Sequence, residues 1–412
     1  MLCPPARIDG RANAGDAPLP QLGLYCHVPF CAPACDYCAF YQTQPRAGDF
    51  ELFVENIGHE LALNPPNSPA ATFFWGGGTP GLLPPELLTS LGTLFLEANG
   101  WRKPVEWTVE MTPGTVRPER LAALRSLGVT RISVGVQSFD PDTLAALGRR
   151  HTQRQVFQAM EWLGEAGFPD ISLDLIFAVP GQDEARWRMD LEQAVRFCPQ
   201  HISTYCLTLE EDTALYIRLA AAGAGKGKKG NGLAASSERE AALYRTSWNF
   251  LEEQGYAQYE ISNFSRPGHS CLHNRNTWRM GEWLGYGPAA ASQLGFRRWR
   301  NPPDLVRWRR GIERAALEAE RVDVVELTPE SLLADALIFG LRMNEGVSPI
   351  ALAERFGCVL PAALGALVHR LHEEGFLDDT AVSEQGDGFL RLTLEGRLRA
   401  DAIAAAILCC FE

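Results

Sequence analysis

The chain has 412 residues, of which 46% are hydrophobic and 21% charged, and its formal net charge is −12. This composition is typical of a large globular protein with room for two domains. The acidic balance disfavours a general nucleic-acid binder, and we interpret the basic runs at 297–300 and 307–310 as solvated helix faces. No apolar run reaches the roughly 18 residues that cross a bilayer, so we expect no membrane span.

Eleven cysteines in this length are too sparse for a disulfide-stapled secreted domain, and no signal peptide precedes them. We therefore expect reduced thiols and a cytoplasmic location. Residues 1–21 are rich in Pro, Gly and Ala, and we expect them to form a flexible leader.

From residue 22 onward, apolar runs alternate with amphipathic patterns. The apolar runs predict buried parallel strands at 22–28, 71–75, 106–111, 131–136, 171–177 and 201–207. The patterns between them predict helices at 50–63, 84–97, 118–127, 141–147, 153–166 and 184–197. Six strand–helix units favour a partial or complete α/β barrel over an open Rossmann sheet. In such barrels the chemistry lies at the carboxyl ends of the strands.

Three cysteines, Cys31, Cys35 and Cys38, follow the first predicted strand at spacings of three and two residues. A zinc site fits poorly, because structural zinc needs four ligands and no second Cys or His pair of matching spacing follows in the next hundred or so residues. The remaining alternative is that this spacing of three cysteines arose by coincidence. Three thiolates suit an iron–sulfur cubane that keeps one iron open for a small molecule.

Unusual residues also lie at or near the ends of the second, third and fourth predicted strands and inside the fifth. The run Trp75–Pro80 contains three glycines, which either let backbone N–H groups approach an anionic ligand or simply form a tight turn. Glu110 and Gln137 end the third and fourth strands and could be ordinary surface residues. Asp174 lies inside an apolar strand, where a carboxylate is costly unless it has a partner, and a bound ligand is the simplest partner.

The pattern changes in the second half of the chain. Residues 222–237 are basic and glycine-rich, which predicts a flexible surface insertion. After Arg310 the strand alternation stops, and short amphipathic helices, a hairpin near 386–394 and a helix from Glu395 predict a separate C-terminal domain over 311–412. We expect this domain to cover the barrel mouth or to dock a partner. Cys409 and Cys410 are interpreted as incidental thiols.

Together, Tyr25-x-His27-x-Pro29-Phe30-Cys31-x3-Cys35-x2-Cys38, Gly76–Pro80, Gly135–Phe139 and Asp174–Phe177 resemble the radical S-adenosylmethionine (SAM) superfamily. Within it the chain is similar to the branch that contains oxygen-independent coproporphyrinogen III oxidase and the HemW-type heme chaperones. The resemblance runs from residue 22 to the end of the chain. It implies a partial (β/α)6-type radical SAM barrel over 22–310 with extra strands and helices, followed by a small, mainly helical, winged-helix-like domain.

The resemblance also implies a set of cofactor sites. A [4Fe-4S] cluster would be held by Cys31, Cys35 and Cys38, and its open iron would chelate SAM. By motif, SAM would be contacted by Tyr25, Tyr37, Gly77, Gly78, Thr79, Glu110, Gln137, Arg149, Asp174 and Thr208. Of these, Arg149 could instead cap a helix C-terminus.

Two features bear on the subfamily. The oxidase carries a further cysteine two residues after the last ligand, whereas this chain has Ala39-Phe40, which favours the chaperone branch. His273 is the first candidate for heme contact and His269 the second, although either could be a loop histidine bonded to backbone. The family's His-Asn-x-x-Tyr-Trp motif has Thr277 in place of the tyrosine, and a later glycine-rich loop has Ala291 in place of a histidine.

The leading interpretation is a heme chaperone that transfers heme to an unknown acceptor protein and takes electrons from a donor, with no nucleic-acid partner. The alternatives are an oxidase that decarboxylates coproporphyrinogen III, and a radical methyltransferase or heme-degrading relative on the same scaffold. Whether the protein is an enzyme stays open, because fold does not determine function.

Overall fold

The computed structural model describes residues 21–32, 34–224, 237–378 and 389–411. Most of the expected leader and insertion, and the first three residues of the expected hairpin near 386–394, lie outside these residues. Within them, one twelve-stranded sheet has the order β12-β11-β10-β9-β1-β2-β3-β4-β5-β6-β8-β7. Its first six strands in chain order are parallel and match the prediction: β1 (Gly23–Val28), β2 (Thr72–Gly77), β3 (Glu106–Met111), β4 (Arg131–Gln137), β5 (Asp170–Phe177) and β6 (His201–Cys206).

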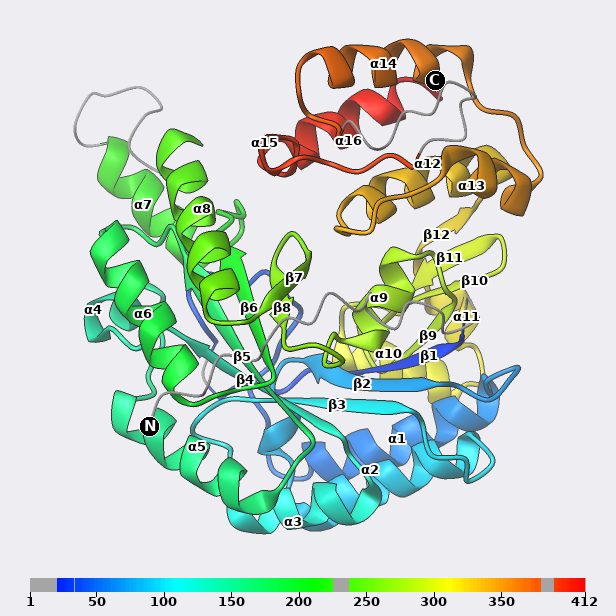
Figure 1. Cartoon of the computed structure of the whole chain (residues 1–412). Coiled ribbons are helices and arrows are strands. Elements are labelled where there is room, and N and C mark those ends of the chain that lie inside the picture. The colour runs from blue at the N-terminus through cyan, green and yellow to red at the C-terminus, as the bar shows by residue number, and fades with distance from the viewer. Residues whose placement is uncertain (1–20, 33, 225–236, 379–388, 412) are drawn as a thin grey trace.

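Helices cover the outer face of this curved sheet (Figure 1). At least one helix follows each parallel strand, and two helices lie between β4 and β5, so the predicted α/β barrel with six strand–helix units is confirmed. The helices are α1 (Asp49–Leu63), α2 (Pro85–Ala98), α3 (Pro118–Leu127), α4 (Pro141–Ala146), α5 (Gln153–Ala166) and α6 (Glu184–Arg196).

The helix ends have local causes. Helix α5 begins at a capping box, in which the Thr152 side chain accepts from the Gln155 N–H, and it ends at Gly167 in the left-handed conformation. The Asp183 side chain caps α6 in the same way as Thr152. Because such signals are encoded within four residues, the predicted helix bounds are correct to within one residue.

The second half of the chain adds short strands at both edges of the sheet. Arg297–Arg300 forms β11, so its interpretation as a helix face is wrong, whereas the run at 307–310 does lie in a helix. The helices and strands between β6 and the C-terminal part are α7 (Ala214–Ala224), α8 (Ser237–Glu253), β7 (Ala257–Glu260), β8 (Asn263–Ser265), α9 (Leu272–Trp278), β9 (Trp283–Tyr286), β10 (Ala291–Leu294), β11 (Arg297–Arg300), α10 (Leu305–Glu313), α11 (Leu317–Glu320) and β12 (Val322–Glu326).

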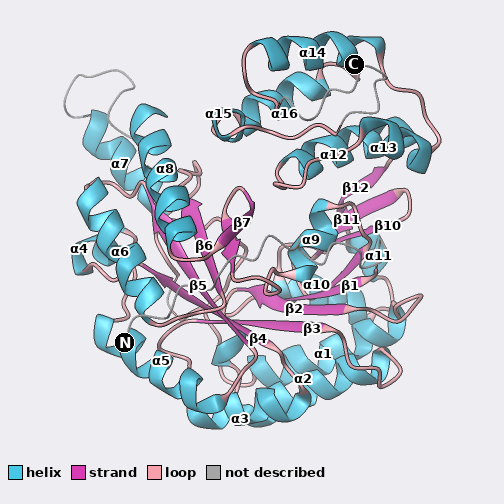
Figure 2. Cartoon of the chain, in the orientation of Figure 1, coloured by secondary structure: helices cyan, strands magenta, loops and turns pink. Residues whose placement is uncertain are grey.

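In the described residues after β12, helices with their own hydrophobic core form the C-terminal part (Figure 2). The core is built around Leu333, Leu337, Leu367 and Ile403. Strand β12 pairs with β11, so the strand alternation does not stop at Arg310 as predicted, and the sheet continues to Glu326. The helices are α12 (Pro329–Leu341), α13 (Pro349–Phe356), α14 (Ala362–Glu373), α15 (Leu394–Arg397) and α16 (Ala400–Leu408).

The C-terminal helices dock on the edge strand β7. The Ile261 N–H donates to the Arg342 carbonyl at 3.2 Å, and the Asn344 N–H donates to the Tyr259 carbonyl at 3.0 Å. These bonds satisfy backbone groups that an edge strand would otherwise leave open. The docked domain therefore faces the inner side of the curved sheet (Figure 1). None of the helices in the described ranges is long and apolar enough to cross a membrane.

A fully buried carboxylate, Glu60 of α1, fastens the β9–β11 edge to the barrel. It accepts hydrogen bonds from the Gly287 N–H (2.8 Å), Asn301 Nδ2 (2.6 Å) and Trp308 Nε1 (3.0 Å). Burial raises the pKa of Glu60 to about 7, and these donors oppose the rise.

We expect Glu60→Ala to destabilise the protein by about 3 kcal/mol or more, because the Gly287 N–H and Trp308 Nε1 lose their acceptor and Asn301 Nδ2 keeps only the Gly287 carbonyl. Urea unfolding would measure this, with the exposed Glu55→Ala on the same helix as control. A loss below about 1 kcal/mol would mean that water replaces the carboxylate.

Candidate functional site

A cavity of about 540 Å³ lies at the carboxyl ends of the parallel strands; we call it the cluster cavity. It collects side chains from the loop after β1 and from the ends of β2 to β6. The sequence-predicted residues that line it are Cys31, Cys35, Tyr37, Cys38, Gly77, Gly78, Thr79, Glu110, Gln137, Arg149, Asp174 and Thr208. Residues spread over almost 180 positions thus meet at one end of the barrel, as expected for this architecture.

The three cysteines stand on the loop between β1 and α1. The loop is held by backbone bonds from the Cys31 N–H to the Thr43 carbonyl (3.0 Å) and from the Cys38 N–H to the Cys35 carbonyl (3.2 Å). All three thiols are free and partly buried. Burial raises the pKa of Cys31 to about 11, a shift opposed by a hydrogen bond with Thr79 and by the Arg149 charge.

The donor set fits an iron–sulfur cluster. Among the described residues, no three His, Cys, Asp or Glu side chains gather closely enough to hold one metal ion. A cubane sets a different requirement, because each cysteine sulfur bonds a different iron and the three sulfurs therefore stand farther apart. Three free thiols that line one cavity, with the half-buried Arg149 guanidinium to offset their charge, are the donor set that such a cluster takes.

The glycine run packs β2 against β1. A Cβ on Gly78 would lie 2.7 Å from the carbonyl oxygens of Val28 and Phe30, and Gly77 has φ +96°. The Gly78 and Thr79 N–H groups donate to those same carbonyls at 2.8 Å. The prediction that these N–H groups meet a ligand is therefore wrong for both. Glycine is required here by the close approach of the backbones.

Two half-buried carboxyl groups face the cavity. Glu110 accepts from the Gly77 N–H at 3.2 Å, and Asp174 accepts from the Ser133 hydroxyl at 3.0 Å. Burial and the charge of Asp174 raise the pKa of Glu110 to about 8. Burial also raises the pKa of Asp174, which the hydroxyls of Ser203 and Ser133 and the Arg149 charge oppose. Paired half-buried acids of this kind suit a cationic or hydroxyl-rich ligand.

Arg149 and Gln137 complete this wall. The Arg149 Nη2 donates to the Gly135 carbonyl at 3.2 Å, so the side chain lies in the cavity and does not cap a helix. Gln137 has φ +67° at a register shift between β4 and β5. A non-glycine residue in this conformation is strained, and such strain concentrates at functional sites.

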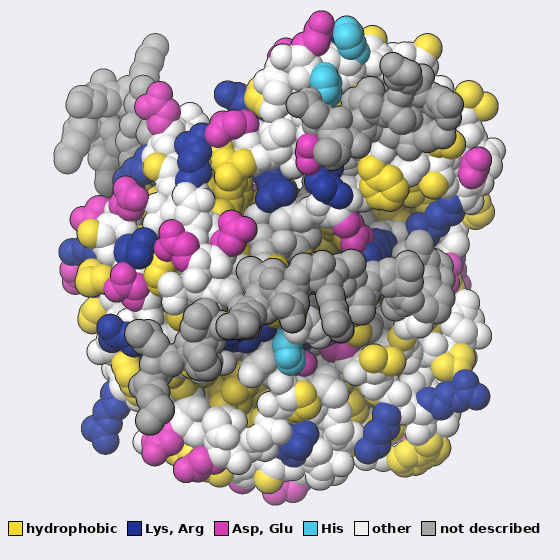
Figure 3. Space-filling view, in the orientation of Figure 1, with side chains coloured by type: hydrophobic (Ala, Val, Ile, Leu, Met, Phe, Trp, Pro, Cys, Tyr) yellow, Lys and Arg dark blue, Asp and Glu magenta, His cyan; other side chains and the backbone are white. Residues whose placement is uncertain are grey.

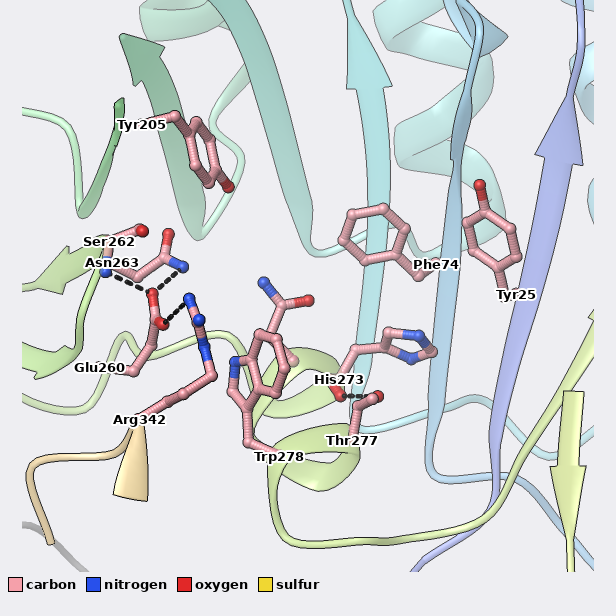
Figure 4. A pocket seen from close by; sticks show the side chains of 11 residues that line it. Tyr25, Phe74, Tyr205, Glu260, Ser262, Asn263, His273, Thr277, Trp278 and Arg342 are labelled. Carbon is pink, nitrogen blue, oxygen red and sulfur yellow. Dashed lines mark hydrogen bonds and ion pairs between the residues drawn. The ribbon is translucent and has the colours of Figure 1, made fainter. Parts of the chain in front are cut away.

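A second cavity, of about 420 Å³, contains His273 and Tyr25; we call it the His273 cavity (Figure 4). The His273 Nδ1 shares a hydrogen bond with Thr72 Oγ1 at 2.9 Å, and the ring packs on Phe74. Burial lowers the pKa of His273 to about 4, which keeps the imidazole neutral. A neutral imidazole with one anchored nitrogen is the form that binds iron.

The other predicted positions lie around this second cavity or outside it. Tyr25 hydrogen-bonds His27 at 3.0 Å and lines the His273 cavity. Thr277 lines it as well, and Ala291 lines an adjoining cavity of about 350 Å³. His269 instead pairs with Asp170 and lines neither of these.

Comparison with known proteins agrees with this geometry. The radical SAM superfamily model matches residues 25–194, and the HemN C-terminal domain model matches residues 327–399. The heme chaperone HemW of Synechocystis is 33% identical over 82% of this chain and 81% of its own length. That of Mycobacterium tuberculosis H37Rv is 32% identical over 96% of this chain and 97% of its own length. The chain belongs to the HemW family of radical SAM proteins.

A solved structure shows the same fold. Coproporphyrinogen III oxidase (HemN) from Escherichia coli superposes with a TM-score of 0.78 at 20% identity, over 94% of this chain and 90% of the oxidase. The HemN C-terminal model begins at residue 327, directly after β12, which agrees with the last strand of the sheet at Glu326. The likeness to the oxidase fold thus extends across the barrel and the C-terminal helices.

One residue of the site, Arg342, belongs to none of the motifs identified in the sequence. Arg342 joins Glu260 at 3.6 Å and stacks on Trp278 at 4.8 Å, opposite His273 in the same cavity (Figure 4). These residues come from three elements far apart in the chain. A pattern in the sequence could not have grouped them, because Arg342 is brought to β7 by the docking of the C-terminal domain.

Proposed function

We propose that this HemW-family protein carries a [4Fe-4S] cluster and SAM in the cluster cavity, binds heme beside His273, and passes the heme to an acceptor protein. Full-length similarity to curated HemW heme chaperones carries this proposal. The cavities support it, because a cofactor site and a histidine-bearing site lie side by side in the barrel mouth.

In the cluster cavity, the three thiolates would hold three irons and leave the fourth open. When bound, the cluster supplies one-electron chemistry at that iron. Arg149 would offset the thiolate charge and meet a carboxylate, while Glu110 and Asp174 would meet cationic or hydroxyl groups. The remaining contacts to SAM would come from Tyr25, Tyr37, Gly77, Gly78, Thr79, Gln137 and Thr208.

In the His273 cavity, the neutral imidazole would bind the heme iron while Thr72 orients the ring. We keep His269 as the weaker candidate, since Asp170 already engages its Nδ1. An electron donor for the cluster and a heme acceptor would complete the cycle, and we place it in the cytoplasm.

The oxidase is the alternative. In its cluster motif a cysteine stands where this chain has Phe40, and the Phe40 side chain is 70% exposed at the edge of the cluster cavity. Likeness to the solved oxidase extends to the fold alone at 20% identity. We therefore expect no porphyrinogen decarboxylation.

Heme titration of the anaerobically reconstituted protein tests this function. His273→Ala is expected to weaken heme binding at least about tenfold and to change the heme absorption spectrum, because an axial ligand is lost. His369→Ala, on an exposed helix surface, is the matched control. Thermal unfolding of both variants separates a lost ligand from a damaged fold.

Unchanged heme affinity and spectrum in His273→Ala would mean that another residue is the axial ligand of the heme iron. Incubating the same reduced protein with SAM and coproporphyrinogen III, followed by mass analysis, tests the alternative. A decarboxylated product would make the protein an oxidase despite Phe40.

A further inference from the structure

A third cavity, of about 810 Å³, separates the end of β6 from the C-terminal helices. Its barrel wall contains Tyr205 and Cys206, and its C-terminal wall contains Arg342, Arg397 and Arg399; we call it the arginine cavity. It shares Tyr205, Ser262 and Arg342 with the His273 cavity, so the two cavities are neighbours. Figure 3 shows Lys and Arg side chains where the C-terminal domain meets the barrel.

Arg397 and Arg399 form no ion pair within 4 Å in the part of the chain that the structure describes. The Arg397 Nη1 donates to Gln258 Oε1 at 2.6 Å, and Arg399 lies over the Phe376 ring at 5.2 Å. Burial and the nearby charge of Arg391 lower the pKa of Arg397. The charges of Glu252 and Asp378 oppose this fall, although neither carboxylate is in ion-pair contact with Arg397. A half-buried guanidinium that no carboxylate contacts directly is costly, and an anion in contact with it would lower that cost.

The first turn of α16 points to the same kind of ligand. Its residues Ala400–Ala402 line the cavity, and the cap residue Arg399 makes no side-chain hydrogen bond to the helix. Uncapped N–H groups carry partial positive charge and bind carboxylates or phosphates. The acids on the cavity wall are Glu240 and Asp401. Arg342 already pairs with Glu260, so Arg397, Arg399 and the helix N-terminus face these two carboxylates.

We propose that the arginine cavity binds the carboxylate side chains of the tetrapyrrole cargo, with Arg397 and Arg399 as the specificity-determining contacts. The macrocycle would extend past Arg342 to His273 in the adjoining cavity. This rests on the proposed heme function. Since the arginines belong to the C-terminal domain and His273 to the barrel, the cargo contacts both domains. Its carboxylates are bound by the C-terminal domain, which does not hold the cluster.

The experiment compares hemin with hemin dimethyl ester, whose two carboxylates are esterified, on the reconstituted full-length protein. The wild type is expected to bind hemin at least about tenfold more tightly than the ester, since each charge-assisted hydrogen bond contributes about that factor. Arg397→Gln and Arg399→Gln are expected to weaken hemin binding and to leave ester binding unchanged. Arg154→Gln, on the exposed first turn of α5, should behave as wild type.

The outcomes separate the two claims. If Arg397→Gln and Arg399→Gln both keep the wild-type preference for hemin, the carboxylate site is wrong while heme binding stands. If the wild type binds neither porphyrin, the proposed function fails and the carboxylate site fails with it. If inorganic phosphate at physiological concentration abolishes the preference without reducing ester binding, the cavity is a general phosphate site and the assignment to the cargo is overturned. Thermal unfolding of each variant excludes a damaged fold as the cause.

Discussion

Cys35→Ala is expected to leave the anaerobically reconstituted protein with less than one iron per chain, against about four in the wild type. Cys35 stands on the loop between β1 and α1 and lines the cluster cavity with Cys31 and Cys38. Removing it leaves two thiolates, which cannot retain a cubane whose fourth iron has no protein ligand. Iron and sulfide assays with visible absorption measure the effect, and Cys31→Ala and Cys38→Ala should match it.

Cys206→Ala is the informative control. Its thiol also lines the cluster cavity, from the end of β6, and burial raises its pKa to about 12. We expect this variant to keep full iron, because three cysteines suffice. Loss of iron in Cys206→Ala would mean that four protein thiolates close the cluster, and the open iron required for SAM would not exist. Full iron in Cys35→Ala would contradict the cluster assignment itself.

The parallel strands and their helices could be predicted because their signals are local. A strand buried on both faces reads as an apolar run, and caps such as Thr152 and Asp183 lie within one helical turn of the residues that they bond. Strand β11 carries no such signal, since four residues dominated by arginine resemble a solvated surface. It becomes a strand through β12, where Arg297 pairs with Glu326 across the ladder.

The candidate site was predictable to the extent that its chemistry is unusual for its position. Three closely spaced cysteines and an aspartate inside an apolar strand stand out, and the barrel rule places them together. The arginine cavity could not be predicted. Arg397 and Arg399 look like ordinary surface residues, and their place in a cavity with Tyr205 and Cys206 appears only when the C-terminal helices dock on the barrel.

Glu110→Gln is expected to change how the stability of the cofactor-free protein depends on pH. Burial and Asp174 raise the pKa of Glu110 from its ordinary 4.5 to about 8. Between these values the unfolded chain has released the proton while the folded protein still holds it. The free energy of unfolding therefore falls as pH rises from about 4.5 to 8, by up to about 1.4 kcal/mol per pH unit, and this contribution is flat outside that window.

Glutamine cannot ionise, so the variant lacks this slope. Relative to wild type, Glu110→Gln should gain about 1 to 3 kcal/mol of stability between pH 5 and pH 8 in urea unfolding. The comparison with wild type cancels the contributions of Glu60 and Asp190, whose pKa values burial also raises. Glu86→Gln, on the exposed side of α2, should run parallel to wild type. If the free energy of unfolding of Glu110→Gln changes with pH in parallel with that of the wild type, water reaches this carboxyl group.

The proton that Glu110 holds in the folded protein leads to a second prediction, about SAM binding. A cationic group beside Glu110 and Asp174 favours the ionised carboxylates, so wild-type protein should release protons when SAM binds at pH 7. Calorimetry in two buffers with different ionisation enthalpies measures that release. In Glu110→Gln the release should fall and the affinity should drop by about tenfold or more, since a charge-assisted contact is lost. A variant that binds SAM with wild-type affinity and the same proton release would place Glu110 outside the cofactor contacts and leave it as the acceptor that holds the Gly77 N–H.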